Sequence, residues 1–389
     1  MSKSYNPVNY DIGLILSCLT LLLLGLVMVA SASINIAQIN FGEPLYYFWQ
    51  QLASAGVGVI LAILIIYMPM EIWQRLSVPL LLLGMSLLIL VLVPGIGYEV
   101  NGSMRWMTLG GIHFQPSEPM KLFMILYLAG YLTRRHEKVR ETLSGFLIPI
   151  IIVCLITSLL LLEPDYGTIV VLFCTVLGML FLAGVPMRQF ILWVILVALA
   201  LSLLIMLAPY RVQRLTTFMD PWADPFDSGF QLTQALIAIG RGELFGVGLG
   251  SSVQKLAYLP EAHTDFLFAI LAEELGLVGA VIVIGLFGFI VLRAFIIAIR
   301  TERQELDYAS YLAYGIGFMI GLQASINLGV NMGLLPTKGL TLPLMSYGGS
   351  SMIITCVMLA LLLRVDHETR LKKGEKRELA NLYSEEKND

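Results

Sequence analysis

The chain has 389 residues, of which 58% are hydrophobic and 13% are charged, with a formal net charge of −3. In soluble proteins about a quarter of the residues are charged, so this composition excludes a soluble enzyme and indicates a polytopic membrane protein. The near-neutral charge balance gives no indication of a nucleic-acid partner. The four cysteines lie inside apolar runs, where they form neither a disulfide framework nor a metal-binding spacing.

Ten apolar runs have the length of a membrane-spanning helix, which needs about 20 mostly apolar residues. The predicted fold class is therefore an all-α polytopic membrane protein with ten transmembrane helices. The first run follows a single lysine and is longer than a signal-peptide core, so we expect an uncleaved span. The expected spans cover about 12–31, 48–67, 77–94, 116–133, 145–163, 168–184, 190–208, 265–299, 308–334 and 344–363.

Basic residues are distributed unequally between the two sides of these spans. With the N-terminus inside, seventeen Lys and Arg fall in cytoplasmic segments, six fall outside, and Lys121 alone falls within a span. This bias follows the positive-inside rule and predicts that both termini are cytoplasmic. The chain then divides into a transmembrane domain at 1–364 and a charged cytoplasmic tail at 365–389.

The longest connection, at about 209–264, is expected outside the membrane between the seventh and eighth helices. It is dense in Gly, Pro and Asp, and its apolar segment QLTQALIAIG predicts a short amphipathic helix on the membrane surface. Long loops in compact proteins are often functional. We therefore expect the external face to carry the chemistry.

Ionisable residues within membrane spans are costly unless they are paired or reach a wet cavity, and Lys121 is such a residue. It has two interpretations. Lys121 forms a structural ion pair with Glu118, three residues earlier on the same helix, or it is a cation that binds substrate. Arg105 lies just upstream on the same external face, and two cations there suit an anionic ligand such as a phosphate.

Amide side chains recur every four residues along the ninth span, at Gln323, Asn327 and Asn331. Such amides often only join helices, and we expect all three to face the bundle interior and not the lipid. The eighth span carries Glu273 and Glu274 at a depth where a bare carboxylate is too costly. We expect both to be capped, paired or protonated.

Asp265 stands where the external loop meets the eighth span. A short acidic side chain there is either an N-cap of the helix or a catalytic carboxylate whose pKa partial burial raises. Glu261 and His263 lie two to four residues before it, on the loop. His263 is a candidate base partner, although a histidine in a loop more often belongs to the polar surface.

Four stretches of the sequence match a known family. They are NGSMRWMTLGGIHFQPSEPMKL at 101–122, EPDYGT at 163–168, the run from GFQLTQ to AEELG at 229–276, and GLLPTKGLTLPLMSYGGSS at 333–351. They extend over nearly the whole membrane part of the chain and resemble the SEDS family. The PTKG turn and the QKLAYLPEAHTD run are more similar to the division branch of that family than to its elongation branch.

The resemblance implies a peptidoglycan glycosyltransferase that polymerises lipid II on the outer side of the bacterial cytoplasmic (inner) membrane, at the division septum. It also implies contact with membrane lipid and two kinds of protein partner, namely a class B penicillin-binding protein and other divisome membrane proteins. In the family the acidic residue of the LPEAHTDF run is catalytic, and here it is Asp265. The essential arginine and the span-four lysine fall on Arg105 and Lys121, whereas Met104 departs from the charged or polar residue of many relatives.

The full set of candidate substrate-binding residues is Arg105, Glu118, Lys121, Arg214, Glu261, His263, Gln323, Asn327, Ser346 and Gly348. Glycosyl transfer from a lipid diphosphate needs a base for the acceptor hydroxyl and cations for the leaving pyrophosphate. One carboxylate base is enough for a single displacement with inversion. A divalent cation, Mg or Mn, is the cofactor that this chemistry would add, although the sequence contains no metal-binding motif.

Two other classes of function stay open at this point. A lipid II flippase would also use a buried polar stripe and lipid-sized grooves, but it would need polar lining on both membrane sides. The concentration of candidate residues on the outer face favours an enzyme. A non-catalytic divisome scaffold would leave Asp265 and Lys121 without a role.

Overall fold

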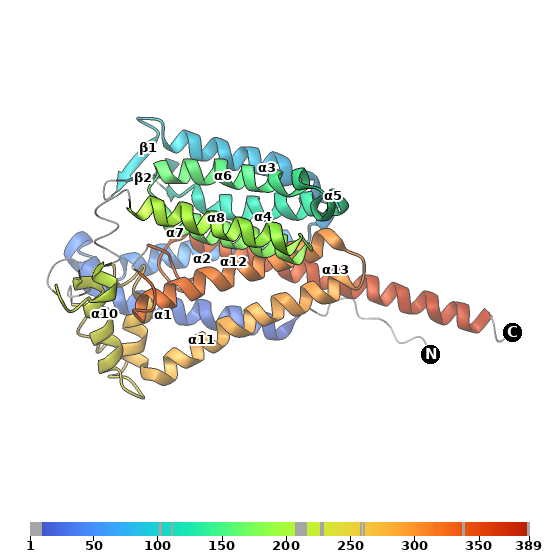
Figure 1. The fold of residues 1–389 in the computed structure, drawn as a ribbon. Coiled ribbons are helices and arrows are strands. Elements are labelled where there is room, and N and C mark those ends of the chain that lie inside the picture. The colour runs from blue at the N-terminus through green and yellow to red at the C-terminus, as the bar shows by residue number, and fades with distance from the viewer. Residues whose placement is uncertain are drawn as a thin grey trace.

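The computed structural model describes residues 10–100, 103–109, 112–206, 216–225, 229–256, 259, 261–336 and 339–386. Within these residues the chain forms a bundle of long helices that run side by side (Figure 1). A long helix coincides with each of the ten expected spans. These helices are α1 Ile12–Phe41, α2 Tyr46–Ile66, α3 Met70–Val91, α4 Ser117–Arg134, α6 Leu143–Leu162, α7 Tyr166–Leu182, α8 Met187–Met206, α11 Leu267–Glu302, α12 Asp307–Asn331 and α13 Gly349–Glu386.

Seven of these helices are long and apolar enough to cross a membrane, namely α1, α2, α3, α6, α11, α12 and α13. The apolar stretches of α7 and α8 are shorter. The 18 residues of α4 include three charged ones, Glu118, Lys121 and Arg134. The chain is therefore a multi-pass helical membrane protein, while the number of ten crossings and the sidedness stay predictions.

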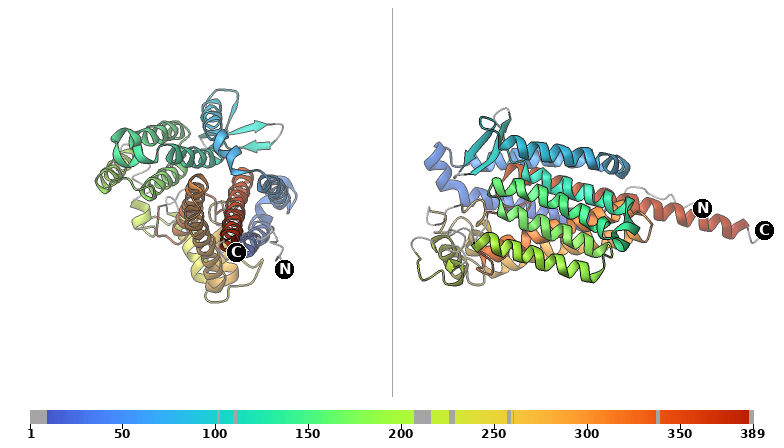
Figure 2. Two further views of the ribbon diagram at one scale, coloured as in Figure 1. Left: turned by 90° about the vertical axis from the view of Figure 1, so that its right-hand side faces the viewer. Right: turned by 45° about the horizontal axis from the view of Figure 1, so that its top comes forward.

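The middle of the bundle is occupied by α12 and α13, as the end-on view in Figure 2 shows. A small residue on α12 permits this close packing. A Cβ at Gly315 would lie 2.4 Å from the side chain of Ile125 on α4 and 2.8 Å from that of Met179 on α7. Helices in membranes approach closely where such small residues face each other.

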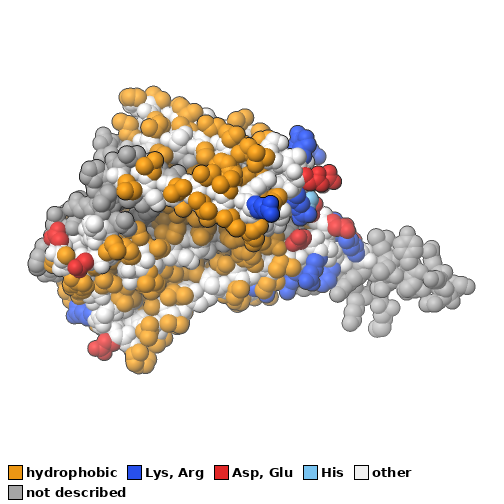
Figure 3. Space-filling model, viewed as in Figure 1, with side chains coloured by type: hydrophobic (Ala, Val, Ile, Leu, Met, Phe, Trp, Pro, Cys, Tyr) orange, Lys and Arg blue, Asp and Glu red, His pale blue; other side chains and the backbone are white. Residues whose placement is uncertain are grey.

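The face of the bundle seen in Figure 3 is apolar along its length and carries its charged side chains at the two ends. Lys and Arg side chains gather at the end from which α13 projects, and few appear at the opposite end. Large apolar side chains such as Leu82, Leu199 and Leu292 are about 60% exposed. Such exposure suits contact with lipid chains rather than with water.

A small antiparallel sheet between α3 and α4 was not predicted from the sequence. It consists of β1 Gly97–Val100, β2 Ser103–Leu109 and β3 Ile112–Phe114, in the order β1-β2-β3. Met107 of β2 pairs with both neighbouring strands and has a buried side chain. Apolar and polar residues do not alternate regularly along β2, SMRWMTL, so the sequence did not indicate a strand there. The sheet holds Arg105, which lies on β2.

The predicted surface helix is present as α10, Phe230–Arg241, and it lies across the end of the bundle (Figure 1). The loop after α10 packs on a break in α11, where Gly276 leaves helical geometry with φ 69° and ψ −168°. A Cβ at Gly276 would lie 2.3 Å from the backbone nitrogen of Gly246, so this contact requires glycine. The eighth predicted span is unusually long because its apolar run covers the helical segments on both sides of this break.

Two buried carboxylates hold this loop against α11. Glu273 accepts a hydrogen bond from Arg241 Nη1 at 3.1 Å, and Glu274 accepts from Lys255 Nζ at 3.0 Å and from Ser31 Oγ at 2.7 Å. Buried carboxylates are tolerated when partners of this kind replace water. The expectation that both residues are paired is confirmed.

The charged C-terminal segment continues the last helix. α13 runs without a break from Gly349 to Glu386 and so extends past the predicted boundary at 364. Glu368 accepts a hydrogen bond from the backbone nitrogen of Met70 at 3.0 Å, which ties the first turns of this segment to α3. The short helix α5, His136–Glu141, lies between α4 and α6.

Candidate functional site

Asp265 lies in the turn that leads into α11, and it does not cap that helix. Phe266 occupies the N-cap position without a side-chain hydrogen bond. The carboxylate of Asp265 is half-buried and accepts no hydrogen bond from any residue that the structure describes. A Cβ at Gly339 would lie 3.1 Å from its Oδ2, so the segment after α12 closes on this side chain. The N-cap interpretation of Asp265 is therefore wrong.

Burial raises the pKa of Asp265 to about 7, and the carboxylate of Glu261 adds to the effect. The Arg105 guanidinium opposes this rise, whereas the carboxylate of Asp165 supports it. All three groups therefore lie within electrostatic range of Asp265. A carboxylate with such a pKa can exchange a proton near neutral pH.

Arg105 reaches from β2 to the corner between α6 and α7. Its Nε donates to the backbone oxygen of Glu163 at 2.7 Å, and its Nη2 donates to that of Pro164 at 2.8 Å. This fork fixes the guanidinium beside the acidic residues. Arg105 and Asp265, which lie 160 residues apart in the sequence, are thereby brought to one site.

The same corner carries two acidic residues for which the residue patterns alone gave no role. Asp165 caps α7, accepting from the backbone nitrogen of Thr168 at 3.2 Å and from Ser117 Oγ at 3.0 Å. Glu163 is fully buried, and neither of its carboxylate oxygens has a partner among the described residues. Burial and the charge of Asp165 raise the pKa of Glu163 to about 8, against the effect of Arg105. Glu163 is therefore mostly neutral at neutral pH.

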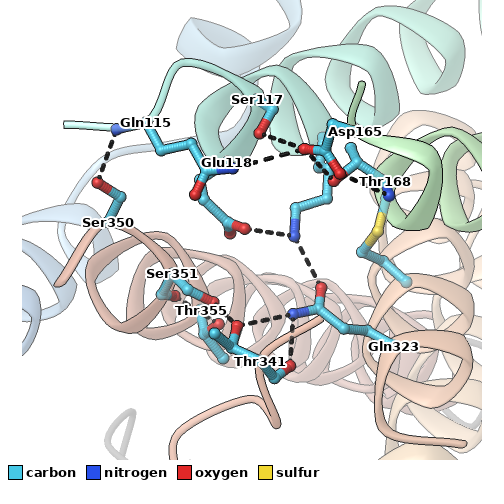
Figure 4. A network of polar contacts seen from close by, with 12 residues as sticks. Gln115, Ser117, Glu118, Asp165, Thr168, Gln323, Thr341, Ser350, Ser351 and Thr355 are labelled. Atoms are coloured by element: carbon cyan, nitrogen blue, oxygen red, sulfur yellow. Dashed lines mark hydrogen bonds and ion pairs between the residues drawn. The ribbon is translucent and has the colours of Figure 1, made fainter. Parts of the chain in front are cut away.

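Lys121 of α4 is completely buried and contacts Glu118 and Gln323, two residues of the polar network that Figure 4 shows. Its Nζ donates to Glu118 Oε1 at 2.9 Å and to Gln323 Oε1 at 2.8 Å. The expected ion pair with Glu118 is present. The lysine also has a second partner on another helix, so the ion pair alone does not account for its position.

The amide stripe on α12 faces the bundle interior, as predicted. Gln323 and Asn327 are each 2% exposed. Gln323 Nε2 donates to the backbone oxygen of Thr341 at 3.0 Å. Asn327 Nδ2 donates to the backbone oxygens of Leu340 at 2.6 Å and of Asp265 at 2.9 Å. The stripe thus joins the segment after α12 both to Lys121 and to Asp265.

His263 packs between aromatic rings instead of contacting Asp265 directly. Its ring centroid lies 4.5 Å from that of Tyr47 on α2 and 5.5 Å from that of Tyr347. Its Nδ1 has no hydrogen-bond partner among the described residues. Burial lowers the pKa of His263, and the charge of Glu261 opposes that change. The surroundings of His263 therefore favour the neutral imidazole.

Ser346 and Gly348 form a turn that is held by a residue the sequence reasoning missed. Gln51 of α2 is fully buried; its Nε2 donates to the backbone oxygen of Ser346 at 2.9 Å. Its Oε1 accepts from the backbone nitrogen of Gly348 at 3.2 Å. The Ser346 hydroxyl accepts from the backbone nitrogen of Leu342 at 3.0 Å. The only advance signal of Gln51 was an amide in an apolar run.

Arg214 lies outside the described residues. Within the described part of the chain, no three His, Cys, Asp or Glu side chains are grouped so that they could hold a metal ion. A role for Mg or Mn therefore stays a prediction.

The sequence also matches a known protein family. The model of the family that contains FtsW, RodA and SpoVE, described as cell cycle proteins, matches residues 13–371. A Nitrosococcus halophilus protein named probable peptidoglycan glycosyltransferase FtsW is 56% identical, over 94% of this chain and 95% of its own length. A Legionella pneumophila protein of the same name is 53% identical, over 94% of this chain and 93% of its own length.

Solved structures share the fold. A chain from a structure described as "Structural coordination of polymerization and crosslinking by a peptidoglycan synthase complex" gives a TM-score of 0.76 at 32% identity, with 93% of this chain and 99% of that chain covered. The rod shape determining protein RodA of Thermus thermophilus gives a TM-score of 0.68 at 31% identity, with 92% and 97% covered. The FtsW relatives confirm the resemblance to the division branch. The chain belongs to the SEDS family of FtsW, RodA and SpoVE.

Proposed function

We propose that the chain is a peptidoglycan glycosyltransferase that polymerises lipid II, with Asp265 as the general base. The observation that carries this proposal is the environment of Asp265. Its carboxylate is free of hydrogen bonds from the described residues, burial raises its pKa to about 7, and the guanidinium of Arg105 is close. The FtsW relatives carry the name of this activity.

In the proposed reaction Asp265 accepts the proton of the acceptor sugar hydroxyl. The hydroxyl oxygen forms a bond to the anomeric carbon of the donor, and the bond from that carbon to the lipid diphosphate breaks. Arg105 and Lys121 offset the negative charge that develops on the diphosphate. A single displacement of this kind inverts the anomeric configuration and needs only one carboxylate. A divalent cation, if bound, would add positive charge next to the diphosphate.

The proposed setting is the bacterial cytoplasmic (inner) membrane at the division septum, with ten spans and both termini in the cytoplasm. The site then faces the external side, together with α10 and the loop that follows it. The cluster of Lys and Arg at the opposite end of the bundle supports this orientation (Figure 3). The division into a transmembrane domain at 1–364 and a cytoplasmic tail at 365–389 belongs to the same proposal.

We also propose that the protein works with a class B penicillin-binding protein and with other divisome membrane proteins. The support is the likeness to a chain described as part of a peptidoglycan synthase complex. In such a complex one subunit would extend glycan chains while the other would crosslink them. The membrane lipid and lipid II complete the set of expected ligands.

The decisive experiment uses the purified full chain in complex with its transpeptidase partner and lipid II, with the products resolved on a gel. Glycan chains longer than the substrate are expected. Fluorescent lipid II in vesicles that contain the chain tests the flippase alternative. Translocation without polymerisation would identify a transporter. If the chain showed neither activity, the scaffold alternative would remain.

A cysteine that replaces Ser251 should react with a reagent applied outside the cell. Ser251 is exposed and lies in the loop between α10 and α11. Ser251→Cys, in a chain whose four native cysteines are replaced by alanine, should react with a membrane-impermeant maleimide in intact spheroplasts. Lys373→Cys, which is exposed on the tail, is the control and should react only after permeabilisation. The reverse pattern would overturn the proposed orientation.

Arg105→Lys should lower polymerisation about tenfold, because lysine cannot donate to the backbone oxygens of Glu163 and Pro164 from one planar fork. Loss of one charge-assisted hydrogen bond, at about 1.5–3 kcal/mol, corresponds to at least that factor. The rate in the lipid II assay is the measurement. Arg75→Lys, the same change at an exposed position far from this site, is the matched control. Equal rates for both variants would contradict the role of the fork.

A further inference from the structure

We propose that Asn327 and Asn331 of α12 are positioning residues, which fix the backbone of Asp265 relative to α11 and to the segment 339–342. This inference rests on the proposed function, because it concerns the residue that is proposed as the base. It assigns a role to a polar stripe that otherwise would only join helices.

Asn331 uses both ends of its amide at the start of α11. Its Nδ2 donates to the backbone oxygen of Asp265 at 2.8 Å, and its Oδ1 accepts from the backbone nitrogen of Ala269 at 3.1 Å. The side chain is fully buried. It therefore supplies from α12 the cap that α11 lacks in its own sequence. The same amide holds the residue that precedes the helix.

Asn327 ties a second segment to the same point. Its Nδ2 donates to the backbone oxygens of Asp265 and of Leu340. Two amides thus converge on one carbonyl oxygen, whose two lone pairs are both used. Gly339 lies beside the carboxylate of Asp265, so the bond to Leu340 fixes the wall that this carboxylate faces. Asn331 Nδ2 also donates to the backbone oxygen of Asn327 at 2.9 Å, with Asn327 Oδ1 at 3.3 Å, so the two residues are linked to each other.

These contacts bear on the reaction because the carboxylate of Asp265 has no hydrogen bond of its own among the described residues. Among the described residues, its position therefore depends on its backbone and on the segment beside it at Gly339. A misplacement of about 1 Å can cost about a factor of 10² in rate, even when the mutated residue does not touch the substrate. The two amides therefore control where the base stands without taking part in proton transfer.

The variant Asn331→Asp separates capping from positioning. Either carboxyl oxygen can still accept from Ala269, but the carboxyl group can donate to the oxygen of Asp265 only while it is protonated. We expect kcat in the lipid II assay to fall roughly 10–100-fold at alkaline pH, with KM for lipid II unchanged. The ratio of its rate to the wild-type rate should rise as pH falls. Glu261, Asp165 and Arg105, whose charges act on Asp265, are common to both proteins, so the new carboxylate is the one charge that differs between them.

Asn327→Asp provides a second variant. It should show a similar pH-dependent ratio because it loses the other donor to the oxygen of Asp265, together with the bond to the oxygen of Leu340. Ser310→Ala is the matched control. Ser310 lies on α12, is buried, and donates to the backbone oxygen of Ala298 at 3.0 Å, away from Asp265. Its loss should lower the unfolding temperature without a change in kcat or in the pH profile.

The two possible failures can be told apart. If Asp265→Asn is inactive while both aspartate variants on α12 keep the wild-type kcat and pH profile, the positioning role is wrong and the proposed base stands. A rate that is reduced equally at every pH, together with a lower unfolding temperature, indicates a structural role only and also rejects the inference. If Asp265→Asn is active, the proposed function itself fails and the inference falls with it.

Discussion

Asp265→Asn is expected to lower lipid II polymerisation by about 10²–10⁴-fold, because asparagine cannot accept the proton of the acceptor hydroxyl. The variant should fold and bind its transpeptidase partner normally. The carboxylate accepts no hydrogen bond from the described residues, and Asn331 supplies the cap of α11. Gel-resolved glycan synthesis measures the effect, and co-purification with the partner is the control. A variant that polymerises lipid II at the wild-type rate would remove Asp265 as the base.

The pH dependence of the wild-type rate tests the same residue independently. Burial raises the pKa of Asp265 to about 7. A base acts in its deprotonated form, so the rate should rise as pH increases through about 7 and then level off. Initial rates with the partner complex at saturating lipid II give this profile. A rate that stays constant across the acidic and neutral range would contradict a base with this pKa.

Lys121→Met is expected to have the second large effect. Methionine is apolar and of similar length, but it leaves the buried Glu118 without its cation and Gln323 Oε1 without its donor. Removing one partner of a buried ion pair costs about 3–5 kcal/mol. The unfolding temperature of the purified protein should therefore fall steeply, and polymerisation should fall with it.

The double variant Glu118→Gln/Lys121→Met separates the two interpretations of Lys121. It removes both charges, so most of the lost stability should return. If Lys121 also binds the diphosphate, polymerisation should stay low although the protein is stable. A stable and fully active double variant would show that the lysine serves only the ion pair.

The positions of the helices could be predicted because lipid requires long apolar runs. The interior orientation of Gln323 and Asn327 followed from the helical period and from the cost of an amide in hydrocarbon. The pair of Lys121 with Glu118 followed from a spacing of three residues. In each case the information lies within one helix, so a local pattern in the sequence is enough.

The contacts that shape the site depend on residues far apart in the chain. Asn331 caps a helix that begins 64 residues earlier, and nothing near Leu267 indicates this. Gln51 holds a turn almost 300 residues later, and the buried Glu163 depends on how the β-sheet covers its corner. The extra turns of α1 up to Phe41 were missed because the polar residues there end the apolar run. Such pairings leave no periodic signal in a single sequence.

The break in α11 constrains how the chain enters the membrane. The backbone oxygens of Glu273 and Glu274 accept from the nitrogens of Val247 at 3.0 Å and Gly248 at 3.1 Å, which belong to the preceding loop. Unmatched backbone groups in hydrocarbon cost several kcal/mol each, so the break is stable only with this loop in place. The loop is synthesised before α11, and in the proposed orientation it lies at the external surface. In that orientation we expect translocation of the loop to precede release of α11 into lipid during biosynthesis.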